Sequence, residues 1–248
     1  MRAGRTPTTA GDSERPGLSW GNLLRWVAVA MSVALLGLGL LIRVPPLIVI
    51  AALFAGAAWL YRRKERPGAI VLVVLFVLVL LLNAPFIIPS LAAPASTIDF
   101  LPTVIVTLLG IVGTISAIAV IRRGTTSEGG ARMIAMGAAT VLVVAAAVTT
   151  IAKIAYPDVS ARPGDISLVT EDFEFSEESL TASGGRIAVF VDNKDATLHT
   201  FTVEELAVDL EIPAGEPGRI TFAAEPGTYE FFCRPHEADM RGTLRISG

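Results

Sequence analysis

Five long apolar stretches, none containing a charged residue, occupy most of the first 155 positions of this 248-residue chain. They are Trp26–Ile42, Val44–Tyr61, Ala69–Ile98, Phe100–Ile121 and Met133–Ala152. A helix needs about 20 apolar residues to cross the hydrocarbon core of a bilayer, whereas a buried helix of a water-soluble protein usually keeps a polar stripe. The third stretch contains Pro85, Pro89 and Pro94, so we expect its helix to end near Ile88–Leu91. The first half of the chain is therefore predicted to be an α-helical membrane bundle of five transmembrane helices.

Basic residues flank these stretches unevenly. Eleven Lys and Arg residues lie at or before the start of the first span and in the loops that join spans 2 to 3 and 4 to 5, against Arg43 alone in the other two loops. Because basic loops are retained in the cytoplasm, we expect a cytoplasmic N-terminus and a C-terminal part outside the cytoplasmic membrane. Cleavage of the first span as a signal peptide is an alternative, although Arg43-Val44-Pro45-Pro46 follows it rather than a small-x-small site. Cleavage would leave the C-terminal part outside as well.

The predicted spans lack the residue types that mark a site of chemistry. No histidine precedes His199, which excludes haem held by paired imidazoles. No Asp, Glu, Lys or Arg lies within a span, so the usual mark of a proton or ion pathway is missing. The bundle is predicted to be an anchor, and we do not expect the protein to be an enzyme.

The charge balance of the chain changes near Tyr156. Residues 1–156 contain 13 Lys and Arg against 5 Asp and Glu, whereas residues 157–248 contain 7 against 18. We expect a cytoplasmic tail over residues 1–22, the membrane region over 23–155, a linker containing Pro and Gly over 156–165 and an extracytoplasmic domain over 166–248.

The last part of the chain has the pattern of an all-β domain. Short runs with strand character are separated by turn sequences such as Ser183-Gly184-Gly185 and Glu225-Pro226-Gly227. The expected strands are 166–175, 186–193, 199–204, 218–223, 228–233 and 242–247. Strands of this length and spacing predict an antiparallel β-sandwich with Greek-key connections.

The chain's one cysteine and two histidines all fall within its last 50 residues. His199 is followed 34 residues later by Cys233, and then by His236 and Met240. Two imidazoles, a thiolate and a thioether are the ligand set that selects copper and suits it for electron transfer. Strand alternation places Phe231 and Cys233 on one face and His199 on the inner face of its own strand. If the loop after Cys233 folds back, His236 meets His199 at one pole of the sandwich.

These residues lie in a longer pattern. It comprises Asp192-Asn193, His199, the run Glu225-Pro226-Gly227-Thr228-Tyr229-Glu230-Phe231-Phe232-Cys233-Arg234-Pro235-His236, and Met240-Arg241-Gly242-Thr243-Leu244. The pattern resembles the cupredoxin family, the plastocyanin, azurin and amicyanin type of blue copper protein, over roughly residues 166–248. The resemblance implies a cupredoxin-like sandwich with one type 1 copper, held by His199, Cys233 and His236 in the equatorial plane and weakly by Met240 on the axis. It also implies that Thr200 braces the loop that bears the cysteine.

Several alternatives stay open at this point. Glu237 or Asp239 is an alternative axial ligand, because the loop after the second histidine varies within the family. Zinc, a metal-free sandwich and a nucleophilic Cys–His pair are the other interpretations of these residues. A binuclear copper centre is excluded, because it needs a second cysteine four residues from Cys233, where this chain has Tyr229 and Glu237.

The ligand set, together with the predicted spans, favours a membrane-anchored copper protein that transfers one electron at a time on the outer face of the membrane. The alternative is a copper storage, delivery or sensing module without redox cycling. Residues 157–248 carry a net charge of −11, which predicts a basic redox partner such as a c-type cytochrome or the basic face of an oxidase. No nucleic-acid partner is expected.

Overall fold

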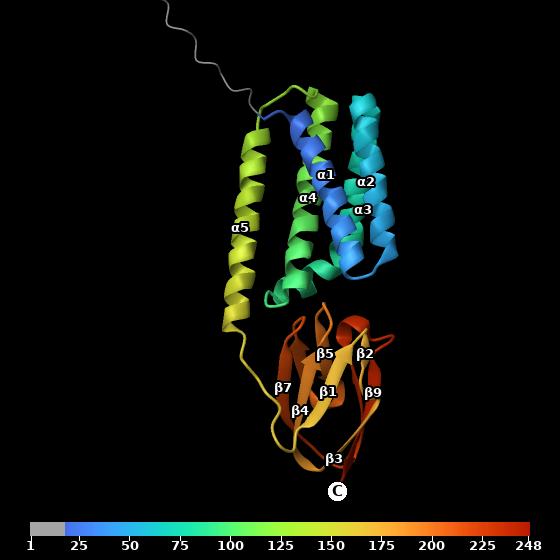
Figure 1. Cartoon of the computed structure of the whole chain (residues 1–248), viewed down its shortest axis with the longest axis vertical. Helices are drawn as coiled ribbons and strands as arrows, with labels where there is room; N and C mark the ends of the chain where they lie inside the picture. Colours follow the sequence, from blue (N-terminus) through green and yellow to red (C-terminus); the bar gives the residue numbers. More distant parts are fainter. Residues whose placement is uncertain (1–17) are drawn as a thin grey trace, which may run out of the picture.

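The computed structural model describes residues 18–248, which form five helices followed by a β-domain (Figure 1). The helices are α1 (Trp20–Leu41), α2 (Pro45–Arg63), α3 (Glu65–Ala92), α4 (Thr97–Arg123) and α5 (Ala131–Ala155). The tail expected over residues 1–22 falls mainly on positions 1–17, which lie outside the described residues.

All five helices are long and apolar enough to cross a membrane. They correspond to the five apolar stretches, and the helical prediction is confirmed. The third helix ends at Ala92, with Pro85 and Pro89 inside its last turns, which agrees with the end expected from its prolines. Arg62 and Arg63 close α2, and Arg122 and Arg123 close α4, so these two helices stop where the apolar sequence stops.

The first four helices share a buried core. The rings of Phe54 and Phe76 lie 4.9 Å apart at its centre, and a Cβ at Gly113 would lie 2.3 Å from the Phe76 ring, so only glycine allows α4 to approach this closely. Large apolar side chains such as Trp26 and Ile154 point outward, as expected of helices whose outer faces contact lipid. Helix α5 stands apart from the others in Figure 1 and packs mainly against α4.

The β-domain is a sandwich of two sheets. Its strands are β1 (Ile166–Glu171), β2 (Glu174–Phe175), β3 (Ser179–Ser183), β4 (Gly185–Asn193), β5 (His199–Val203), β6 (Val208–Ile212), β7 (Pro217–Ala224), β8 (Gly227–Phe232) and β9 (Arg241–Ser247). One sheet has the order β2-β1-β4-β7 and the other the order β3-β9-β8-β5-β6. Apolar side chains from both sheets, including Val189, Phe201 and Phe231, form one buried core between them.

The predicted β-sandwich is confirmed, but two of its strand pairs are not antiparallel as expected. Strand β1 pairs with β4 in parallel, and β3 pairs with β9 in parallel. The chain leaves the first sheet after β2, forms β3 in the second sheet and then returns to the first sheet as β4. Because β2 is antiparallel to β1 and β4 is parallel to β1, the chain reverses its direction between β2 and β4.

The prediction of one strand over 166–175 is wrong. The backbone turns at Asp172 and Phe173, whose φ angles are 53° and 64°, and the chain reverses into β2. Two consecutive residues with positive φ make a tight hairpin of the type I′ kind. Strands β3 and β6 were not expected from the sequence; β6 alternates apolar and acidic residues at the edge of its sheet.

The sandwich lies at the end of the bundle where α3 ends and α4 begins (Figure 1). The segment between α5 and β1 is fixed at its far end, where Asp165 accepts two hydrogen bonds of 2.8 Å from the Arg219 guanidinium of β7. Near its other end, Lys153 of α5 forms a 3.1 Å ion pair with Glu216. The ion pair joins the end of α5 to the loop before β7.

Candidate metal centre

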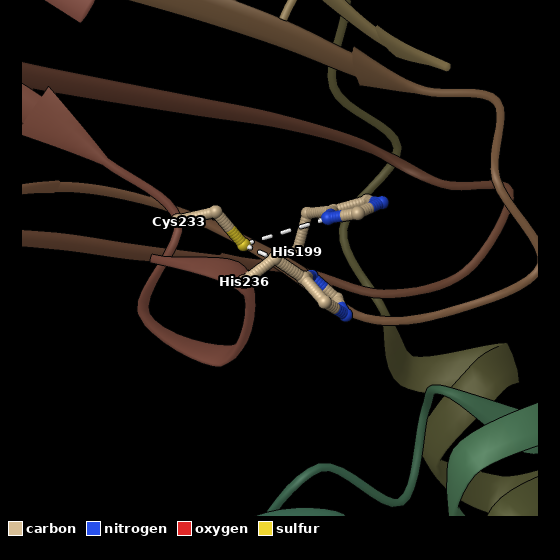
Figure 2. Close-up of side chains that lie close together, drawn as sticks. All are labelled: His199, Cys233 and His236. Carbon is tan, nitrogen blue, oxygen red and sulfur yellow. Dashed lines mark hydrogen bonds between the residues drawn. The ribbon is translucent and has the colours of Figure 1, made fainter. Parts of the chain in front are cut away.

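Three of the four predicted ligand residues form one cluster at the pole of the sandwich that faces the bundle. The sulfur of Cys233 lies 3.5 Å from Nδ1 of His199 and 3.5 Å from Nδ1 of His236 (Figure 2). The ligand atoms of all three residues lie within 4.8 Å of one another. His199 and Cys233 are fully buried, and His236 is partly buried.

Two strand ends and a short helical turn bring these side chains together. His199 begins β5, and Cys233 follows directly after β8. Residues Arg234–His236 form a 3₁₀ turn with Pro235 as its second residue, and the amide of His236 donates to the carbonyl of Cys233 at 3.0 Å. This turn returns the second histidine to the first, so the expected fold-back of the loop is confirmed.

Thr200 braces the loop that bears the cysteine, as the resemblance implied. Its Oγ1 accepts a 2.8 Å hydrogen bond from the amide of Arg234, and its own amide donates to the sulfur of Cys233 at 3.4 Å. The residue after the first histidine therefore holds both the sulfur and the peptide that follows it.

Met240 is buried and packs in the same core cluster as Cys233. Its carbonyl accepts from the amide of Cys233 at 3.0 Å, and its amide donates to the carbonyl of His236 at 2.9 Å. Glu237 and Asp239, the alternative axial ligands, are exposed, and Glu237 is bound by Arg241 at 2.7 Å. The burial of these three residues favours Met240 as the axial ligand.

A further group that the sequence did not reveal is the carboxylate of Asp195. Its Oδ2 lies 2.8 Å from Nε2 of His199. Because a carboxylate can only accept, Nε2 carries the proton and Nδ1 keeps its lone pair facing the sulfur. The same carboxylate accepts from the amides of Asp172 and Phe173 at 2.8 and 3.1 Å. A spacing of four residues through an irregular loop gives no sign in the sequence of this contact between Asp195 and His199.

The other group that the sequence did not reveal is the Phe173 ring. Its centroid lies 5.0 Å from that of His236 and 6.0 Å from that of His199, edge-on to both rings. Phe173 comes from the β1–β2 turn and is 41% exposed. The edge formed by Phe173 and His236 is therefore the side of the cluster that reaches the surface of the sandwich.

Burial determines the protonation of the three side chains. It lowers the pKa of His199, against the opposing effect of the Asp195 hydrogen bond, and it also lowers the pKa of His236. Burial raises the pKa of the Cys233 thiol, which the amide hydrogen bonds to its sulfur partly offset. At neutral pH both imidazoles are therefore uncharged and can each offer a nitrogen lone pair to a metal ion, whereas the thiol must release its proton when the ion binds.

The donor set and its spacing fit a metal ion. Two ligands about 2.0–2.3 Å from one ion are roughly 3.5 Å apart, which is the separation of the sulfur from each Nδ1. Among residues 18–248, no carboxylate joins the cluster as a fourth member, so it does not offer the four strong ligands of a structural zinc site. Two imidazoles and a thiolate, with a buried methionine in the same core, match the ligand set of a trigonal copper site.

The fold and the cluster together define a cupredoxin-type sandwich with two histidines and one cysteine gathered at one end. A family model described as a cupredoxin-like domain matches residues 138–246. Plastocyanin from Dryopteris crassirhizoma is 32% identical over 99 residues, covering 30% of this chain and 89% of the plastocyanin. The chain belongs to the cupredoxin-like family, a copper-binding electron-transfer fold.

Solved structures of amicyanin are similar to the β-domain. Amicyanin from Paracoccus versutus (Thiobacillus versutus) is 16% identical, with 35% of this chain and 85% of amicyanin covered and a TM-score of 0.30. A reduced amicyanin mutant is 22% identical, with 35% of this chain and 86% of the other covered and a TM-score of 0.30.

The Asp195 contact gives a prediction for metal affinity. Asp195→Asn keeps the shape of the side chain but removes the charged acceptor that orients His199 and sets its tautomer. We expect copper affinity to fall by about 10- to 100-fold, the usual effect of losing a hydrogen-bond partner of a ligand histidine. A competition titration with a chelator of known affinity measures it.

Asp192→Asn is the matched control, because Asp192 lies at the end of β4, three residues before Asp195, and forms an ion pair with Lys194 at 2.5 Å. It should leave the affinity unchanged. Equal affinity in the Asp195 variant and this control would contradict the positioning role.

Proposed function

We propose that the protein is a membrane-anchored copper protein that carries single electrons on the outer face of the cytoplasmic membrane, and that it is not an enzyme. The observation that carries this proposal is the buried His199–Cys233–His236 cluster, with its two 3.5 Å sulfur–nitrogen separations. Copper, when bound, supplies a Cu(I)/Cu(II) couple that both thiolate and imidazole ligands tolerate. His199, Cys233 and His236 would hold the ion, with Met240 as the weak fourth ligand.

The rigidity of the cluster favours electron transfer over copper storage or delivery. Asp195 orients one histidine, Thr200 binds the loop of the cysteine, and the backbone of Met240 closes the loop. Side chains fixed in this way need little rearrangement when an electron arrives. A delivery protein needs ligands that another molecule can reach, whereas His199 and Cys233 are fully buried.

The exposed edge at Phe173 and His236 is the proposed place of electron exchange. Acidic residues adjoin it in the sequence, since Asp172 and Glu174 stand on either side of Phe173 and Glu237, which is paired with Arg241, follows the second histidine. All three are exposed. Negative charge near His236, the partly buried ligand, would steer a basic redox partner, such as a c-type cytochrome or an oxidase, to this edge.

Stopped-flow reduction of the full-length, copper-loaded chain in lipid nanodiscs by a basic c-type cytochrome tests the proposal. The rate constant should fall at least about tenfold as salt is raised from low ionic strength through the physiological range, because exposed charges are screened beyond roughly 8 Å at 0.15 M. Asp172→Asn with Glu174→Gln should reduce this salt dependence; asparagine also tolerates the positive φ of position 172.

The control pair is Glu204→Gln with Glu205→Gln, which removes the same charge beyond the far end of β5, away from His199. It should change the salt dependence much less than the pair at the turn. Copper that binds tightly but exchanges no electrons with any cytochrome, at any salt concentration, would favour the storage or delivery function instead.

A further inference from the structure

The turn between α3 and α4 contacts the loops that lead into the metal centre. Asp99, in the first turn of α4, accepts hydrogen bonds through both carboxylate oxygens: Oδ1 from the Thr197 hydroxyl at 2.8 Å and Oδ2 from the Leu198 amide at 2.6 Å. Ser96, the residue before α4, accepts from the amide of Ala214 at 3.3 Å. Ser96 is fully buried and Leu198 nearly so, whereas Asp99 and Thr197 are partly buried.

The position of Asp99 is more specific than a helix start requires. An acidic residue in the first turn is favourable because the N-terminus of a helix carries partial positive charge, and Asp99 also accepts from the Ser96 hydroxyl. That role needs no partner outside the helix. Yet both donors from the β-domain belong to the two residues directly before His199, nearly 100 positions away in the sequence.

The two donors are also differently placed. The Thr197 hydroxyl belongs to a side chain that solvent partly reaches, whereas the Leu198 amide begins the backbone of the strand that carries the histidine. A carboxylate that holds both of them restrains the backbone just before His199, whereas Asp195 holds the imidazole itself. The Asp99 carboxylate also places a negative charge one residue from a ligand, in surroundings that are mostly shielded from water, where charges act more strongly than in bulk solvent.

We propose that Asp99 is a positioning residue through which the membrane bundle fixes the His199 strand and adds negative charge beside the metal centre. The bundle is then part of the site and not only an anchor. It covers the Thr197 and Ala214 side of the pole, which leaves the Phe173 and His236 edge for partners. The electrostatic part of this proposal rests on the proposed copper function, whereas the structural part does not.

Amide hydrogen exchange of the full-length, metal-free chain in nanodiscs tests the structural part. Asp99→Ala should speed exchange at the Leu198 amide by about tenfold or more, because its acceptor is gone. Thr197→Val removes the other hydrogen bond without touching α4, and should also speed exchange in residues 195–199. Unchanged exchange in both variants overturns the proposal, and the valine variant remains informative if the alanine variant does not fold.

The reduction potential of the copper-loaded chain tests the electrostatic part. Asp99→Asn should raise the midpoint potential, because loss of a nearby negative charge disfavours the more positively charged oxidised ion. The matched control is Glu65→Gln, the acidic first-turn residue of α3 at the opposite end of the bundle, which should move neither exchange at Leu198 nor the potential. An equal shift in this control, or no shift in Asp99→Asn, overturns the electrostatic part. A chain that binds no copper contradicts the proposed function while the exchange result still stands.

Discussion

Replacing Cys233 by serine should abolish the intense visible absorption of the copper-loaded chain. The absorption expected of this site comes from charge transfer between a thiolate and copper, and the serine hydroxyl is neither as soft nor as easily ionised as a thiol. Cys233 is the only cysteine of the chain, so no other thiolate can replace it. The measurement is the visible spectrum of the full-length chain, in detergent or nanodiscs, after addition of one equivalent of Cu(II). Full colour in Cys233→Ser would contradict the ligand assignment.

Two further variants rank the other ligands in the same experiment. His236→Ala should lose most of the bound copper, because it removes a strong imidazole ligand. Met240→Leu conserves volume in the buried core and should keep the copper and the colour, with a raised reduction potential. If Met240→Leu loses copper as completely as His236→Ala, Met240 is not a weak axial ligand.

A reporter fused after Gly248 should be active only outside the cytoplasmic membrane. Five helices long enough to span the membrane, with basic residues concentrated around the start of α1 and around the α2–α3 and α4–α5 connections, predict this all-or-none result. The measurement is the activity of a phosphatase that folds only outside and of a fluorescent protein that folds only inside. The fluorescent protein should be active, and the phosphatase inactive, when inserted between Glu128 and Gly129, two exposed residues in the loop joining α4 to α5.

The opposite pattern at these two positions would contradict the orientation, whereas reporters active on the same side at both positions would contradict α5 as a membrane span. The opposite pattern would also place the metal centre in the cytoplasm, where the proposed partners on the outer face cannot reach it. The result does not depend on copper, so it separates the location of the domain from its chemistry.

The helical half of the protein was predictable because its signal is local. An uninterrupted apolar stretch needs no knowledge of its neighbours to be recognised, and the observed helices match the five stretches. The same holds for the segment Cys233–Met240, whose ligand spacing lies within one loop. The return of this loop to His199 was also predictable, because side-chain alternation along β5 and β8 places the His199 and Cys233 side chains on the inner faces of their strands.

Pairing of strands was less predictable, because it depends on the path of the chain between the sheets. A strand sequence carries no mark of its neighbour's direction, so the parallel pairs β1–β4 and β3–β9 were missed. The turn at Asp172 and Phe173 was missed because neither residue is the glycine or asparagine that most often marks positive φ.

The sequence by itself determined the two halves of the chain, the five apolar helices, the all-β domain and the residues of the His₂Cys cluster. Only the tertiary structure showed which groups surround that cluster. Asp195 hydrogen-bonds His199, Phe173 packs edge-on against His236, and Asp99 reaches the strand from the bundle. The physical reason is that a ligand set follows from residue type and spacing, whereas a hydrogen bond between distant segments exists only once packing has brought them together.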